Sequence, residues 1–110
     1  MSSKTILIVS NEPDYLEQLS AAFEFDDGYI VTTASSIEEA RGYKDKEFDF
    51  VVIEGFDGNG VSLHDELNGK RKLIWTSNHR VVNEAKTRGL EAHLKITSLD
   101  LLKILENGTP

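Results

Sequence analysis

The sequence contains no cysteine, which excludes disulfides, zinc–thiolate sites and thiol catalysis. Basic residues are also scarce, because 12 Lys and Arg stand against 19 Asp and Glu and give a net charge of -7. Such a charge opposes binding to a phosphate backbone or to an anionic membrane surface. Residues 1–10 include no long hydrophobic segment and no cleavage signal, so neither a signal peptide nor a membrane span is predicted. We therefore expect a cytoplasmic protein that binds neither nucleic acid nor membranes.

The length and composition fit one small domain. The chain has 110 residues, of which 39% are hydrophobic, enough to bury a single core. We assign residues 1–106 to this domain. Residues 107–110 have no hydrophobic periodicity and are interpreted as the start of a linker.

Strand-like and helix-like segments alternate along the chain. Strands are predicted at residues 5–9, 29–32, 48–53, 72–75 and 90–94. Helices are predicted after Pro13, after the cap Ser36, over 61–67 up to Gly69, from the cap Asn78 to Gly89, and after Thr97. This alternation predicts an α/β fold, a doubly wound (βα)5 three-layer sandwich with a parallel five-stranded sheet. Right-handed crossovers favour the strand order 2-1-3-4-5.

Polar residues follow the predicted strands at one edge of the sheet. They are Ser10 and Asn11 after the first strand, Glu54 after the third, Thr76 after the fourth and Lys95 after the fifth. Open α/β sheets place their ligands and chemistry at the carboxyl ends of the strands. These residues are therefore the candidate functional site.

The segment from Ile6 to Pro13 resembles the opening of the receiver domains of bacterial response regulators, and the similarity runs over nearly the whole chain. The resemblance implies a flavodoxin-like fold and a role in two-component signal transduction. In that family an acidic pair stands where this chain has Ser10 and Asn11, and the phosphoacceptor aspartate stands where it has Glu54. A Ser or Thr and a Lys occupy the positions of Thr76 and Lys95.

The departures from the family pattern indicate a degenerate member, a pseudo-receiver. In a receiver the acidic pair and the aspartate hold Mg²⁺, whereas Ser10 and Asn11 supply only neutral oxygens, so we assign neither a metal nor a cofactor. Glu54 is longer than Asp by one methylene, which displaces its carboxylate by about 1.5 Å and makes it a poor phosphoacceptor. Ile96 replaces a cis-proline, and His93 or Ala92 replaces the switch aromatic.

The sequence therefore predicts a regulatory or protein-interaction module that has no catalytic activity and acts independently of phosphorylation. Its partner is expected to be another protein, an output domain of the same polypeptide, or a second copy in a homodimer. The expected surface combines the fourth helix, the fifth strand and the fifth helix. Its candidate residues are Arg80, Asn83, Glu84, Lys86, His93, Lys103 and Glu106.

Two other functions are compatible with the sequence. The first is an atypical phosphoacceptor receiver that uses Glu54 or Asp57. The second is a small-ligand-binding flavodoxin-like domain, although no glycine-rich phosphate loop follows the first strand.

Purely structural roles are also predicted for several of these side chains. Glu54 is expected to pair with Lys95 in a partly exposed ion pair. The hydroxyls of Ser10 and Thr76 are expected to bind nearby backbone. Trp75 is predicted to pack in the core or at its edge, and His64 and His79 to lie on the surface.

Overall fold

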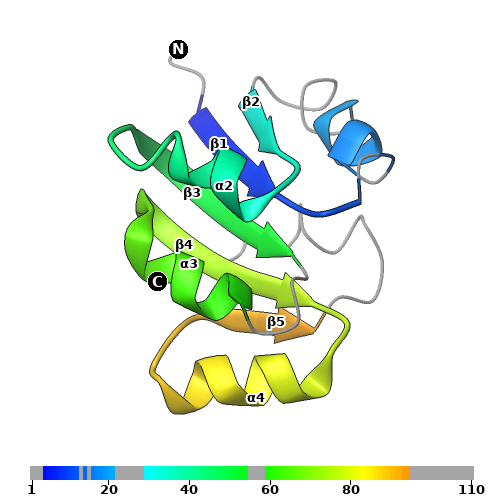
Figure 1. Cartoon of the computed structure of the whole chain (residues 1–110), viewed down its shortest axis with the longest axis vertical. Coiled ribbons are helices and arrows are strands. Elements are labelled where there is room, and N and C mark those ends of the chain that lie inside the picture. Colours follow the sequence, from blue (N-terminus) through cyan, green and yellow to red (C-terminus); the bar gives the residue numbers. More distant parts are fainter. Residues whose placement is uncertain (1–3, 13, 15, 22–28, 55–58, 95–110) are drawn as a thin grey trace.

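In the computed structural model, five parallel strands form one sheet (Figure 1). The structure describes residues 4–12, 14, 16–21, 29–54 and 59–94. The strands are β1 Lys4–Val9, β2 Tyr29–Ala34, β3 Glu47–Glu54, β4 Asn68–Thr76 and β5 Ala92–Leu94. Their order is β2-β1-β3-β4-β5, which confirms the predicted topology. The predicted last helix and the linker lie outside the described residues.

Helices cover both faces of the sheet. The helices α2 Ile37–Arg41, α3 Asn59–Glu66 and α4 His79–Thr87 lie on one face (Figure 1). Residues 16–21 are helical and pack on the other face through Leu16 and Leu19. The helices that the structure describes are all too short or too polar to cross a bilayer.

The helix boundaries follow local signals in the sequence. Ser36 and Asn78 accept hydrogen bonds from backbone N–H groups in the first turns of α2 and α4, which confirms both predicted caps. Gly89 has a φ of 78°, the left-handed conformation that allows a chain to leave a helix. The predicted end of α4 is therefore also confirmed.

Two hydrophobic layers sandwich the sheet, because successive side chains of each strand point to opposite faces. The layer beneath α2, α3 and α4 includes Leu7, Val51 and Ile74. The layer beneath residues 16–21 includes Ile8 and Trp75. Trp75 is fully buried, which confirms its predicted packing role.

Gly69 does not end the third helix, as the sequence predicts, because α3 already ends at Glu66. Gly69 lies inside β4, which spans nine residues rather than the short segment expected. A Cβ atom at position 69 would lie 2.7 Å from Val51 Cγ2, closer than carbon atoms approach. The glycine therefore serves the packing of β4 against β3. The opposite error occurs at β5, which is shorter than predicted.

His64 is buried, although the sequence predicts a surface position. Its exposed fraction is 7%, and within the described residues neither ring nitrogen has a hydrogen-bond partner. Oδ1 of the neighbouring Asp65 lies 3.6 Å from Nδ1 of His64. Leu63 and Leu67 are buried with it, so His64 belongs to the face of the third helical segment that packs inward.

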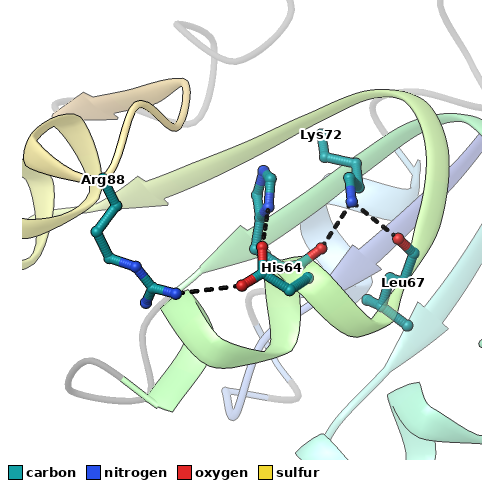
Figure 2. A network of polar contacts seen from close by, with 5 residues as sticks. His64, Leu67, Lys72 and Arg88 are labelled. Carbon is teal, nitrogen blue, oxygen red and sulfur yellow. Dashed lines mark hydrogen bonds and ion pairs between the residues drawn. The ribbon is translucent and has the colours of Figure 1, made fainter.

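Lys72 of β4 holds the carboxyl end of α3 (Figure 2). Its ammonium donates hydrogen bonds to the carbonyl oxygens of His64 at 2.9 Å and Leu67 at 3.0 Å. Helix ends leave such carbonyls without partners inside the helix, and a cation there also opposes the negative end of the helix dipole. Arg88 binds Asp65 at 3.1 Å and links the end of α4 to α3.

This arrangement predicts acid-sensitive stability. Burial, and after it the charge of Lys72, lower the pKa of His64. In the unfolded chain the pKa of a histidine is about 6.5, so below that pH the unfolded chain binds more protons than the folded one. The contribution of His64 to the free energy of unfolding is therefore complete above about pH 6.5 and declines as the pH falls. His64→Leu should remove this decline and, by removing an unsatisfied buried imidazole, raise the free energy of unfolding by about 1 kcal/mol at neutral pH. Urea unfolding between about pH 5 and pH 7.5 measures both effects.

His79→Leu is the matched control, because His79 is exposed at the start of α4. Its pH dependence should follow that of the unmodified chain. Parallel pH profiles for the unmodified chain and His64→Leu would contradict the assignment to His64.

Candidate functional site

A buried hydrogen bond joins Ser10 and Glu54 at the carboxyl edge of the two central strands. Ser10 Oγ donates to Glu54 Oε2 at 2.6 Å. Ser10 is 0% exposed and Glu54 is 4% exposed. The parallel register of β1 and β3 pairs Val9 with Ile53, which places the next residues of both strands side by side. Hydrogen bonds from hydroxyls to carboxylates are short and comparatively strong, so this contact holds the carboxylate in one position.

Ser10 is fixed by two further hydrogen bonds. Its hydroxyl oxygen accepts from the backbone N–H of Glu12 at 3.2 Å, which confirms the predicted backbone partner. Its own N–H donates to the carbonyl of Ala34 at 3.0 Å. Ser10 therefore ties together the ends of β1, β2 and β3.

Thr76 ends β4, next to β3 in the sheet. It is buried, and its Oγ1 accepts a hydrogen bond from the N–H of Asn78 at 3.1 Å. This contact also confirms a predicted backbone partner, and it shapes the turn into α4. Asn11 is exposed. Lys95 and Asp57 lie outside the described residues, so the predicted pair between Glu54 and Lys95 stays a prediction.

The donor set of the described site does not fit the Mg²⁺ site of a receiver. Of Ser10, Asn11 and Glu54, only Glu54 carries a carboxylate, and its Oε2 already accepts from Ser10. Mg²⁺ requires several hard oxygen ligands in near-octahedral geometry. Across the described ranges, no three His, Asp or Glu side chains gather closely enough to hold a metal ion.

An ion cluster beside β5 joins His93 to Arg71 and Glu91, two residues that were not among the sequence-based candidates. Glu91 accepts a hydrogen bond from Arg71 Nε at 2.9 Å, and His93 Nε2 lies 2.7 Å from Glu91 Oε2. Hydrogen bonds from Arg71 first, and then from His93, lower the pKa of Glu91. Arg71 and Glu91 stand 20 positions apart, and only the strand pairing brings them together. A sequence signal was available in their opposite charges near the predicted fourth and fifth strands.

The two candidates for the switch-aromatic position lie on different faces of the sheet. Ala92 packs in the layer beneath α4 with Val81 and Ala85. Because side chains alternate along a strand, His93 points to the other face, where it is half-exposed and contacts Glu91.

The described part of the candidate interaction surface is divided: His93 of β5 points to the face of the sheet away from α4, and the other residues lie on the outer side of α4. Val81, Val82 and Ala85 form the buried side of this helix. The opposite side is exposed and includes Arg80, Asn83, Glu84 and Lys86. Lys103 and Glu106 lie outside the described residues.

No family model matches the sequence, and no curated protein matches it. Solved structures of receiver domains do match the structure. A CheY-like response regulator receiver domain protein from Methanospirillum hungatei has a TM-score of 0.80 at 21% identity, over 97% of this chain and 94% of the other. The response regulator TrrA from Thermotoga maritima, in complex with Mg²⁺ and BeF, has a TM-score of 0.77 at 23% identity, over 96% and 97%.

Two further structures show that proteins of different origin share this fold. A response regulator from Burkholderia pseudomallei, which carries a phosphorylated aspartic acid, has a TM-score of 0.76 at 22% identity, over 96% of this chain and 68% of the other. A de novo designed Rossmann 2x3 protein has a TM-score of 0.74 at 16% identity, over 100% and 94%. The likenesses establish a CheY-like receiver fold, and the site must supply the evidence on function.

The hydrogen bond between Ser10 and Glu54 should be measurable in stability. Ser10→Ala removes the hydroxyl that donates a hydrogen bond to the buried Glu54 carboxylate. We therefore expect a loss of about 1–3 kcal/mol in the free energy of unfolding. Ser77→Ala, at an exposed position one residue beyond β4, should change it by less than about 0.5 kcal/mol. Urea unfolding provides both values. Similar small losses for both variants would contradict a stabilising role for the Ser10 hydroxyl.

Proposed function

We propose that this chain is a pseudo-receiver, a receiver-fold module of two-component signalling in the cytoplasm that acts on a protein partner without being phosphorylated. The observation that carries the proposal is the buried hydrogen bond between Ser10 and Glu54. It lies where the receiver family has one carboxylate of its acidic pair and its phosphoacceptor. The neutral hydroxyl of Ser10 replaces the carboxylate of the acidic pair and cannot neutralise the charge of a metal ion. The longer side chain of Glu54 replaces the phosphoacceptor aspartate.

The chemistry of phosphoryl transfer explains why this substitution matters. The reaction depends on a metal ion that neutralises charge and on a nucleophile held in line with the phosphoryl group. Glu54 is 4% exposed, and the hydrogen bond from Ser10 to its Oε2 holds the carboxylate in one position. A misplacement of about 1 Å can reduce the rate of a positioned reaction about 100-fold. The proposal therefore assigns no catalytic activity to the chain.

A carboxylate held in one position favours a constitutive surface rather than a switched one. The exposed side of α4, with Arg80, Asn83, Glu84 and Lys86, is the described surface that we assign to partner binding. The partner is another protein, an output domain of the same polypeptide or a second copy. Charged side chains of both signs on this helix favour a partner with a complementary polar surface.

Phosphorylation provides the direct test. Incubation of the chain with acetyl phosphate and Mg²⁺ should add no phosphoryl group in an intact-mass measurement, because Glu54 is buried and no acidic pair is present. The triple variant Ser10→Asp, Asn11→Asp, Glu54→Asp is the matched comparison. It should regain partial Mg²⁺ binding with little phosphorylation, since Ile96 still replaces the proline.

An adduct on the unmodified chain, mapped to Glu54 or Asp57, would instead support the atypical phosphoacceptor. A bound small molecule that co-purifies with the chain in native mass spectrometry would support the ligand-binding alternative. Efficient labelling of the triple variant would place the whole defect in those three residues.

The α4 surface provides an independent test. Arg80→Glu with Lys86→Glu should reduce partner capture at least about five-fold in a quantitative pull-down from the source cells, because two charges of the surface are reversed. Addition of acetyl phosphate should leave capture by the unmodified chain unchanged. Lys44→Glu, an exposed change outside α4, should bind as the unmodified chain does. Unchanged capture by a folded double variant would exclude this surface.

A further inference from the structure

The outer edge of β2 lacks the features that usually protect an edge strand. Within the described part of the chain, no strand pairs with this side of β2. The strand Tyr29–Ala34 has six residues and contains neither a charged residue nor a proline. Natural proteins block exposed edges with charges, prolines or very short strands. The other edge, β5, follows this rule, since it has three residues and lies beside the ion cluster of Glu91 and His93.

The backbone of β2 presents hydrogen-bonding groups outward. The carbonyl of Ala34 accepts from Ser10, so Ala34 directs its backbone groups toward β1. Backbone directions alternate along a strand, and Thr32 is therefore turned toward β1 as well. The N–H and C=O groups of Val31 and Thr33 face away from the sheet. An added strand would bind these groups.

An open groove of about 600 Å³ borders the carboxyl end of this edge. It lies between the helical residues 16–21 and the end of β2. Its walls include Leu16, Glu17, Ser20, Thr33, Ser35 and Glu39. A second hollow, lined in part by Asp14 and Gln18, shares Glu17 with it. Side chains from alternate positions of an added strand could enter the groove.

The groove is acidic. Glu17 is exposed and makes no ion pair with any described residue, and Glu39 binds the N–H of Ser35 with Oε1. Neither hollow is lined by a described lysine or arginine. On the opposite face of β2, Ile30 is 58% exposed, the most exposed large hydrophobic side chain of the described residues. One face of the edge therefore favours a cation, and the other favours an apolar contact.

We propose that the outer edge of β2 binds, by strand addition, an extended segment of a partner protein in which basic residues alternate with apolar ones. Charge complementarity selects this occupant, because the groove carries Glu17 and Glu39 and the whole chain carries a net charge of -7. A second copy is disfavoured, because its own β2 has no basic residue for the groove. Figure 1 shows β2 and α4 at opposite ends of the sheet, so this surface does not depend on the proposed function.

A synthetic peptide that alternates Lys and Val tests the proposal, with binding to the full chain followed by amide chemical shifts. The Lys–Val peptide should shift the amides of residues 30–33 saturably. A Glu–Val peptide of the same length should not, because the groove is acidic. A Lys–Val peptide with alternate backbone nitrogens methylated should bind at least about ten-fold more weakly, since strand addition depends on main-chain hydrogen bonds.

A matched pair of variants tests the charge of the groove. Glu17→Lys should weaken the Lys–Val peptide about three- to five-fold or more, and Asp45→Lys, in the turn after α2, should leave its affinity unchanged. Both acidic residues are exposed, so neither change should impair folding.

Several results would overturn the proposal. These are equal binding of the Lys–Val and Glu–Val peptides, shifts that avoid β2, or undiminished binding of the methylated peptide. A dimer in light scattering that Ile30→Lys dissociates would assign this edge to a second copy instead. A negative result here leaves the phosphorylation test of the pseudo-receiver unaffected, because that test depends on Ser10 and Glu54 alone.

Discussion

A carboxylate removed from water must find a hydrogen-bond partner, and in this chain that requirement joins Glu54 to Ser10. Ser10 follows β1 and Glu54 ends β3, and both of these neighbouring central strands have side chains buried on both faces. The pairing of β1 with β3 fixes the backbone positions of both residues. Ser10 also binds the end of β2 through Ala34, so the contact organises the same edge of three adjacent strands.

The hydrogen bond between Ser10 and Glu54 indicates that the receiver fold does not by itself imply phosphoryl transfer. Receiver domains that match this structure include proteins in complex with Mg²⁺ and BeF or with a phosphorylated aspartic acid, but a designed protein matches the same arrangement of strands almost as well. The sheet therefore supplies a position at its carboxyl edge, and the side chains at that position decide what it does. Here a neutral hydroxyl and a buried glutamate favour a fixed arrangement.

The polar contacts away from the site also join elements that lie apart in the sequence. Lys72 of β4 donates hydrogen bonds to two carbonyls at the end of α3. In the same region the imidazole of His64 is buried without a hydrogen-bond partner among the described residues. Arg71 and Glu91 join β4 to the approach of β5 and draw in His93. The two surfaces that we assign to partners, α4 and the edge of β2, lie at opposite ends of the sheet (Figure 1).

The sequence by itself determined the features that depend on near neighbours. The alternation of strand-like and helix-like segments predicted the central strands, the caps Ser36 and Asn78 predicted two helix starts, and Gly89 predicted a helix end, because each signal acts over a short stretch of chain. Tertiary structure decided the rest. Gly69 is required by Val51 of another strand, His64 is buried by the way α3 packs, and Ser10 meets Glu54 across 44 positions. Such contacts depend on strand register and on packing between elements, which no local pattern of residues specifies.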